Sequence, residues 1–182
     1  MNNYHYYLKL PVKFNPKPVN MEGGHHRLYP IDRLEQDFAN WFIKQGVRIG
    51  HGEQFELSTA GVSKHIIHTD DFDNKPIVKL NYVYCDTPHL MNWYKLKPGV
   101  KVTTAFSPAG TPYSSCTENE CDLVYSVQVG QPSLVNVMEL HDVPNVSSTR
   151  ICYSFVLAHA DKPVRLNWEE ATHLLKDFIV GS

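Results

Sequence analysis

The sequence predicts a mainly β protein of the α+β class, built as a sandwich or jelly roll with flanking helices. Three observations support this fold class. A segment with helical spacing ends near residue 46, a second helical segment closes the chain, and the residues between them form short apolar runs. Gly, Pro, Asn and Asp separate these runs, and short strands punctuated by turn residues are typical of sandwiches and barrels. No internal repeat of fixed period is present in the sequence.

Residues 1–46 are predicted to form an arm followed by a helix. The first 30 residues contain four prolines and a Gly-Gly pair, which resist regular structure, so we expect the arm to wrap over the body. From Ile31 to Gln45, apolar residues recur at helical spacing with polar residues on the other side, and Gly46 ends the pattern. We therefore expect an amphipathic helix that packs on a sheet.

The β-rich core is predicted to span residues 47–160. Candidate strands lie at residues 47–49, 55–57, 64–68, 78–84, 89–96, 100–106, 123–129, 134–140 and 150–157. Asn167 and Glu170 have the spacing of a capping box and predict a C-terminal helix over residues 167–179. A chain of 182 residues that is 42% hydrophobic is long enough for one substantial core, so residues 1–182 are expected to form a single domain.

The most informative motif is the H-x-D sequence of His68 and Asp70, followed by His141 73 positions after His68. Successive side chains of an extended segment point to opposite faces, so His68 and Asp70 share a face and can bind one cation, with His141 as the third ligand. Two histidines and one carboxylate form the facial triad of non-heme Fe(II) oxygenases. His65 competes with His68, and Asp71 competes with Asp70, but each competitor would lie on the opposite face of an extended strand.

Arg150 follows His141 by nine residues, which is enough for a turn and entry into the next strand. In the strand predicted at residues 150–157, the odd-numbered side chains are bulky and apolar, whereas Arg150 and Ser154 share the other face. A guanidinium on that face suits the far end of a dicarboxylate, because its planar fork can bind a carboxylate bidentately.

Lys79 and Asn81 show the same alternation in the strand predicted at residues 78–84. Both side chains face away from the apolar side of that strand, so they are expected to point into the same cavity as Arg150. Alternatively, Lys79 is solvated at a strand edge. If Lys79 does enter the cavity, it competes with Arg150 as the anchor for a dicarboxylate.

With these residues in this order, the chain resembles the 2-oxoglutarate/Fe(II)-dependent oxygenases. The stretch from His141-Asp142-Val143-Pro144-Asn145 to Arg150-Ile151 is most similar to the aspartyl/asparaginyl β-hydroxylase-like and prolyl-hydroxylase-like branches, and the resemblance covers the last two thirds of the chain.

The resemblance implies a double-stranded β-helix in which His68, Asp70 and His141 bind Fe(II). It also implies that 2-oxoglutarate binds the iron and places its other carboxylate on Arg150, and that dioxygen is used to hydroxylate an amino acid, a peptidyl residue or a small metabolite. Many relatives carry Ser or Thr two residues after the arginine, where this chain has Cys152, so Ser154 is the nearest hydroxyl for the co-substrate.

Two other functions are compatible with these residues. A cupin-like metal enzyme, such as an isomerase or a keto-acid-independent dioxygenase, would use the same barrel and triad without requiring Arg150 inside. A non-catalytic β-sandwich binding module would leave His68, Asp70 and His141 apart.

Composition restricts the partners and the compartment. The formal net charge is −2 and no basic run is present, so we do not expect nucleic-acid binding. The sequence has neither a signal-like N-terminus nor an apolar run of about 18 residues, so we expect a cytoplasmic protein that does not enter the membrane. The four cysteines match neither a zinc ribbon nor a C-x-x-C pair, and we expect free thiols. Nothing in the sequence specifies the oligomeric state.

The substrate side is predicted from two further segments. The polar stretch from Ser107 to Asp122 is long for a structureless connection, which favours a functional loop or lid beside the site. The run 91–94, together with Tyr113, is a candidate aromatic wall for a small substrate. Trp93 and Tyr94 point opposite ways in a strand, so one of them is expected to belong to the core.

Overall fold

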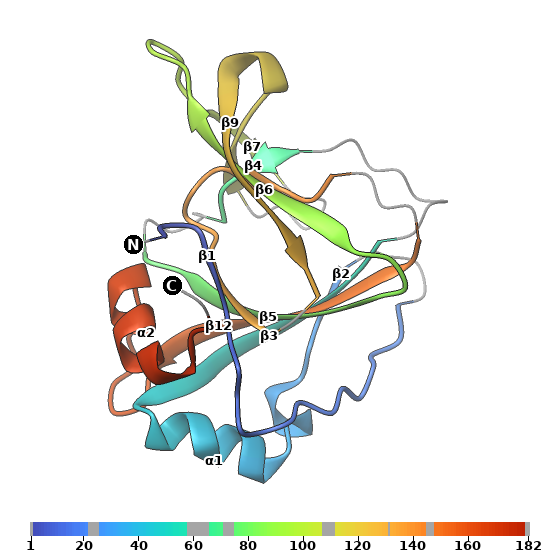
Figure 1. The fold of residues 1–182 in the computed structure, drawn as a ribbon, viewed down its shortest axis with the longest axis vertical. Helices are drawn as coiled ribbons and strands as arrows, with labels where there is room; N and C mark the ends of the chain where they lie inside the picture. Colours follow the sequence, from blue (N-terminus) through green and yellow to red (C-terminus); the bar gives the residue numbers. More distant parts are fainter. Residues whose placement is uncertain are drawn as a thin grey trace.

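The computed structural model describes residues 2–21, 26–57, 66–70, 75–106, 112–130, 132–144 and 148–180. Within these residues the chain is mainly β and forms two antiparallel sheets of six strands each (Figure 1). The predicted mainly β fold with two flanking helices is confirmed.

The first sheet has the strand order β1-β10-β5-β12-β3-β2. Its strands are β1 (His5–Tyr7), β2 (His26–Leu28), β3 (Val47–Leu57), β5 (Val78–Cys85), β10 (Ser133–Asn136) and β12 (Arg150–His159). β12 pairs with β5 on one side and with β3 on the other. β1 and β2 come from the N-terminal arm and pair with β10 and β3, so the arm that we expected to be irregular supplies both edge strands. Each has three residues, too few for a periodic signal in the sequence.

The second sheet has the strand order β7-β8-β4-β11-β6-β9. Its strands are β4 (Ile67–His68), β6 (His89–Leu96), β7 (Thr103–Phe106), β8 (Pro112–Cys116), β9 (Cys121–Val129) and β11 (His141–Asp142). β8 was missed, because its residues were assigned to the polar stretch 107–122. It pairs with β7 and β4 at one side of the sheet, so backbone pairing and not burial of an apolar face holds it in place.

β3 is one long strand where the sequence predicted two short ones. The two glycines of the gap, Gly50 and Gly52, misled the prediction, since glycine usually marks a strand end or a bulge. A Cβ atom at Gly52 would lie 2.8 Å from the carbonyl oxygen of Tyr29, so glycine here permits a close approach of the arm. The backbone N–H of Tyr29 donates to the Gly52 carbonyl at 2.7 Å, which ties the arm to the sheet.

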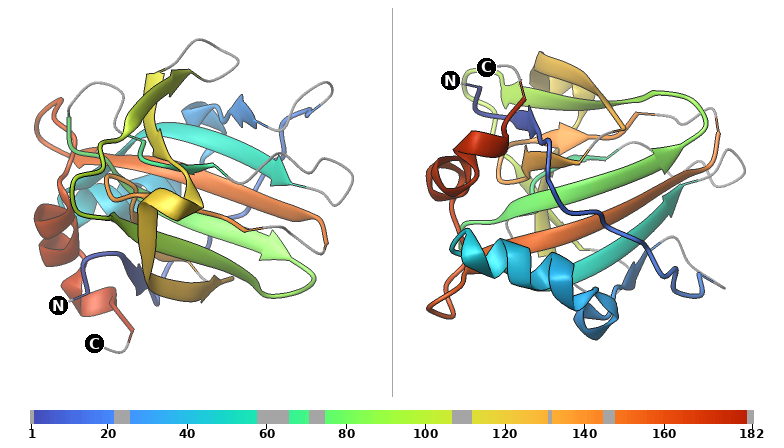
Figure 2. Two further views of the ribbon diagram at one scale, coloured as in Figure 1. Left: turned by 90° about the horizontal axis from the view of Figure 1, so that it is seen from above. Right: turned by 60° about the horizontal axis from the view of Figure 1, so that its bottom comes forward.

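The helices cover the outer face of the first sheet, so this sheet lies between the helices and the second sheet (Figures 1 and 2). α1 (Gln36–Lys44) buries Phe38 and Phe42 in a core that includes Tyr153, Phe155 and Leu157 of β12. The even-numbered residues of β12 face the second sheet, where Cys152 and Val156 join another core cluster. The alternation predicted for this strand is therefore correct.

The helix ends follow local capping chemistry. The predicted capping box is present before α2 (Trp168–Leu174): the Asn167 side chain accepts from the backbone N–H of Glu170, and the Glu170 carboxylate accepts from that of Asn167. The helix predicted over residues 31–45 is interrupted: a 3₁₀ turn (Ile31–Arg33) is separated from α1 by Leu34 and Glu35, which are extended. A 3₁₀ turn (Lys176–Phe178) follows α2. A short 3₁₀ turn (Glu118–Glu120) precedes β9. In the described ranges, no helix has the length and apolar character needed to cross a membrane.

We predict that protonation of His5 destabilises the fold. His5 lies on β1 with 2% of its surface exposed, and burial lowers its pKa from 6.5 to about 4. Because the folded state binds the proton more weakly than the unfolded chain, stability should be lost as the pH falls from 6.5 towards 4, by up to about 1.4 kcal/mol per pH unit.

His5→Phe keeps a ring against Tyr7 and Trp93 and removes the titrating group. Urea unfolding at pH 8, 6 and 4 should give a smaller loss of stability for the variant than for the parent. Equal losses in the two proteins would show that His5 does not contribute to the acid sensitivity.

Candidate metal and co-substrate site

A half-open cavity of about 290 Å³ lies between the two sheets. Seven polar side chains line it, and they are the seven that the sequence analysis assigned to the metal or the co-substrate: His68, Asp70, Lys79, Asn81, His141, Arg150 and Ser154. The remaining lining consists of Cys152 and six apolar side chains: Phe55, Leu57, Ile66, Met91, Val137 and Val143. Strand alternation therefore brings all the candidate residues to one internal space.

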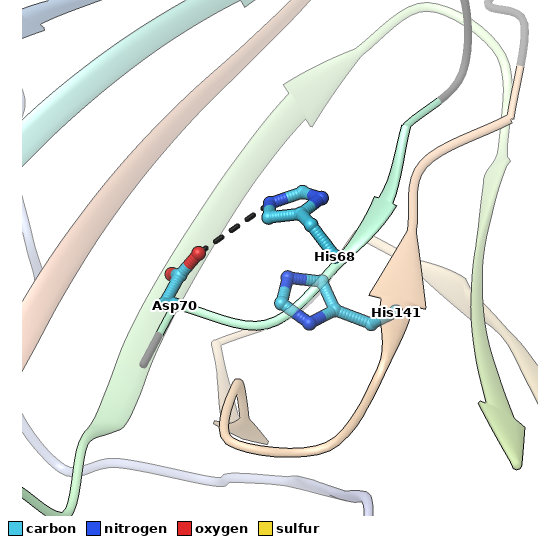
Figure 3. A group of neighbouring side chains, drawn as sticks. All are labelled: His68, Asp70 and His141. Atoms are coloured by element: carbon cyan, nitrogen blue, oxygen red, sulfur yellow. Dashed lines mark ion pairs between the residues drawn. The ribbon is translucent and has the colours of Figure 1, made fainter. Parts of the chain in front are cut away.

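His68, Asp70 and His141 converge at one wall of this cavity (Figure 3). β4 and β11 are neighbours in the second sheet, and their register places His68 directly opposite His141, with ring centroids 4.6 Å apart. The Nε2 atom of His68 lies 3.4 Å from Oδ1 of Asp70. One ligand atom from each of the three residues lies within 4.8 Å of the other two, which is within reach of a single ion.

Backbone hydrogen bonds fix the segment that carries Asp70. The backbone N–H of Asp70 donates to the carbonyl of Val137 at 2.8 Å, and that of Thr69 donates to the carbonyl of Ser114 at 2.9 Å. The chain leaving β4 is thus tied on both sides, so the position of the carboxylate does not depend on side-chain packing alone.

Both imidazoles are oriented by backbone carbonyls. Nδ1 of His68 lies 2.8 Å from the carbonyl oxygen of Ile66, and Nδ1 of His141 lies 2.9 Å from that of Glu139. A carbonyl oxygen only accepts, so Nδ1 carries the proton in both rings and Nε2 is left for a cation. Metal-binding histidines generally donate their other ring N–H in this way.

The electrostatics of the triad favour a shared cation. Burial lowers the pKa of His141 to about 4, with a further contribution from His68, so this ring is neutral at pH 7. Burial also opposes protonation of His68, but the neighbouring Asp70 carboxylate outweighs it and raises the pKa of His68. Without a proton, Nε2 of His68 and Oδ1 of Asp70 would be two acceptors facing each other. A proton or a metal ion between them removes that repulsion.

Lys79 is buried in the cavity wall and pairs with two carboxylates. Its Nζ atom lies 2.7 Å from Oδ2 of Asp70 and 2.6 Å from Oε2 of Glu53. Burial would lower the pKa of Lys79, but Asp70 and Glu53 raise it above the ordinary value, so the ammonium stays charged. The alternative of a solvated Lys79 at a strand edge is therefore wrong, since only 5% of the residue is exposed.

Glu53 was missed by the sequence analysis. It falls in the gap between the two short strands predicted at 47–49 and 55–57, so no face was assigned to it. If Val47–Leu57 is treated as one strand, Glu53 shares a face with Phe55 and Leu57, and this alternation is the signal that could have found it.

Arg150 lies at the first position of β12 with 3% of its surface exposed. In the described ranges no carboxylate pairs with its guanidinium, and its Nε atom has no hydrogen-bond partner. Asn81 and Ser154 lie opposite each other on β5 and β12, and the Ser154 hydroxyl donates to Oδ1 of Asn81 at 2.7 Å. Arg150, a buried cation with no anionic partner among the described residues, thus shares the cavity with a neutral polar pair.

The other sequence predictions have mixed outcomes. His65, Asp71 and residues 107–111 lie outside the described residues. Trp93 is fully buried and donates its ring N–H to the Asn136 carbonyl, so it belongs to the core and not to a substrate wall. Tyr113 of β8 lies beside His68, with ring centroids 5.8 Å apart. All four cysteines have free thiols, as predicted.

Comparisons with known proteins do not assign this site, because no family model, no curated protein and no solved structure matches the chain. The function is therefore inferred from the chemistry of the cavity. Two imidazole nitrogens and one carboxylate oxygen are suitable donors for a divalent first-row transition metal, and the orientation of both rings fits that role.

We predict that the protein binds Fe(II) under anaerobic conditions through these three residues. Asp70→Ala and His141→Ala should each weaken binding by more than about a hundredfold, since losing a ligand exceeds the effect of losing its supporting contacts. Isothermal titration with Fe(II) and with Co(II) would measure the affinity. His173→Ala, which changes an exposed histidine on α2, is the control.

Asp70→Ala should still fold, because Lys79 keeps its ion pair with Glu53. Far-ultraviolet circular dichroism would verify this. Parent-like Fe(II) affinity in both ligand variants would mean that the metal site has been misassigned.

Proposed function

We propose that this protein is an Fe(II)- and 2-oxoglutarate-dependent oxygenase that hydroxylates an amino acid, a peptidyl residue or a small metabolite. One observation carries the proposal. A two-histidine, one-carboxylate cluster and a buried arginine with no carboxylate partner in the described ranges line the same cavity. The cluster suits Fe(II), and the arginine suits the distal carboxylate of a dicarboxylic keto acid.

The strand order supports a double-stranded β-helix for this fold. In chain order, β3, β4, β5 and β6 alternate between the first and the second sheet, and so do β9, β10, β11 and β12. A chain that changes sheet at each step winds as a helix of strands. β7 and β8 extend the second sheet beside β4, next to the candidate metal ligands.

Iron and 2-oxoglutarate, when bound, would supply the oxidation: dioxygen converts the keto acid into succinate and carbon dioxide and delivers one oxygen atom to a C–H bond of the substrate. The protein residues hold and orient these groups. His68 and His141 offer neutral nitrogens, and Asp70 offers one negative charge, so the cation keeps a net positive charge that attracts an anionic co-substrate.

Arg150 is the better candidate for the distal carboxylate than Lys79. The Lys79 ammonium already contacts Asp70 and Glu53, whereas no described carboxylate pairs with Arg150. Asn81 and Ser154 pair with each other across β5 and β12, and Ser154 lies four residues along β12 from Arg150. Both side chains line the same cavity and offer neutral polar contacts. The apolar lining, which includes Met91, offers a surface against which a substrate C–H group could pack.

The convergence of the three ligands argues against a non-catalytic binding module, which would have left them apart. A cupin-like enzyme that does not use 2-oxoglutarate shares the triad, so Arg150 distinguishes between the two remaining functions.

We predict that Arg150→Ala weakens 2-oxoglutarate binding at least about thirtyfold, since a charge-assisted pair in a buried site contributes on the order of 2 to 5 kcal/mol. Arg150→Lys should recover only part of the affinity, because an ammonium keeps the charge but lacks the planar fork. Anaerobic titration of the Fe(II) protein with 2-oxoglutarate, followed by the visible charge-transfer band of the chelate, would measure it. Arg48→Ala, at an exposed position of β3, is the matched control.

Fe(II) affinity should be unchanged in both Arg150 variants, because Arg150 is not a metal ligand. A parent protein that binds Fe(II) but gives no chelate band and no succinate would replace the proposal with the cupin-like function. Equal 2-oxoglutarate affinity in the parent and Arg150→Ala would remove Arg150 from the site.

A further inference from the structure

We infer that Lys79, held in place by Glu53, is a positioning residue that makes Asp70 a one-oxygen metal ligand. This inference rests on the proposed metal site and concerns how its carboxylate is controlled. Lys79 and Glu53 are not among the candidate metal ligands, and neither residue has a role in the proposed reaction.

The two oxygens of Asp70 have different surroundings. Oδ1 faces His68 Nε2 at 3.4 Å, on the side where a cation would bind, whereas Oδ2 lies 2.7 Å from the Lys79 ammonium. Only 18% of the Asp70 side chain is exposed, so water does not easily replace the lysine. The carboxylate is thereby fixed in a rotation that presents one oxygen to the metal and keeps the other on Lys79.

Lys79 is itself held from several sides. It projects from β5 of the first sheet, whereas Asp70 follows β4 of the second sheet, so the ion pair crosses the space between the sheets. The Nζ atom lies 2.6 Å from Oε2 of Glu53 on β3 and 5.7 Å from the ring centre of Phe55. These contacts keep the ammonium from following Asp70 if the carboxylate rotates.

Glu53 is restrained through its second oxygen. Oε1 lies 3.2 Å from Nε2 of His26 on β2 and 3.9 Å from Nε2 of His51 on β3. Burial would raise the pKa of Glu53, but these histidines and Lys79 hold it below the ordinary value, so Glu53 stays ionised. Successive ion pairs therefore connect His26, a half-exposed residue, through Glu53 and Lys79 to the candidate metal ligand Asp70.

One-oxygen binding has a consequence for the reaction. A carboxylate that chelates a metal through both oxygens takes one more coordination position than a carboxylate that binds through one. The facial triad works because it leaves positions open for the co-substrate and dioxygen. By occupying Oδ2, Lys79 keeps one of those positions available.

A simpler role for Lys79 would be to neutralise charge. The two roles predict opposite effects of Lys79→Met on the affinity for cations. Glu53, Lys79 and Asp70 together carry one net negative charge, which Lys79→Met makes more negative and Glu53→Gln removes. If only charge matters, Lys79→Met should bind cations more tightly. If Lys79 positions Asp70, the same variant should bind them more weakly.

The decisive protein is the double variant Lys79→Met/Glu53→Gln. It keeps the net charge of the group at that of the parent, removes the contact to Asp70 Oδ2, and leaves no buried charge on Glu53 without its partner, so it should fold even if the single variant does not. We expect its Fe(II) affinity, measured anaerobically by titration calorimetry, to fall about tenfold to a hundredfold, the usual effect of losing a contact that orients a metal ligand. Lys79→Arg should recover part of the loss, because a guanidinium can also bridge the two carboxylates.

A second readout is the visible band of the Fe(II) and 2-oxoglutarate chelate, which should shift or weaken in the double variant and return towards the parent in Lys79→Arg. Parent-like Fe(II) affinity and an unchanged band in the double variant, or tighter binding by Lys79→Met, would overturn the positioning role and leave the proposed function intact. A parent that binds no Fe(II) would instead overturn the proposed function.

Discussion

The site depends on one constraint, the register between β4 and β11. Residues directly opposite each other on antiparallel strands have neighbouring side chains, so pairing His68 with His141 brings together two imidazoles that lie 73 positions apart. A slip of one residue would turn one ring to the other face of the sheet and separate the pair. The position of Asp70 then follows from local geometry, because Asp70 lies two residues beyond His68 and its backbone N–H donates to the carbonyl of Val137.

Charge is the second constraint, since apolar side chains of the core between the sheets, including Met91 and Val137, also line the cavity, so its ionised groups need partners. Lys79 meets this need for Asp70 and Glu53 and connects the two sheets at the point where the candidate ligands converge. Arg150, in contrast, has no carboxylate partner in the described part of the chain. This asymmetry separates a lysine that organises the wall from an arginine that is available to a ligand.

The sequence predicted the position of a side chain correctly where that position follows from the alternation of residues along a strand. Alternation placed Arg150 and Ser154 on the cavity face of β12, and Lys79 and Asn81 on that of β5, as the structure shows. It missed Glu53, because Gly50 and Gly52 were interpreted as the gap between two short strands, so the alternation along β3 was not followed through residue 53. β1, β2, β8 and β11 were missed for a related reason. They have two to five residues, too few for a periodic signal, and backbone pairing with neighbouring strands holds them in the sheets.

The pairing of the arm also bears on how the chain reaches its folded state. His5 of β1 lies opposite Val135 of β10, 130 residues later, and Leu8 forms an isolated bridge with Ile179. During synthesis β1 leaves the ribosome before β10 and lacks this partner until the 130 residues that separate His5 from Val135 have followed. Contacts of such long sequence separation form slowly. Until the arm docks, β10 is an open edge that another chain could pair with, so slow docking would favour aggregation of newly made molecules.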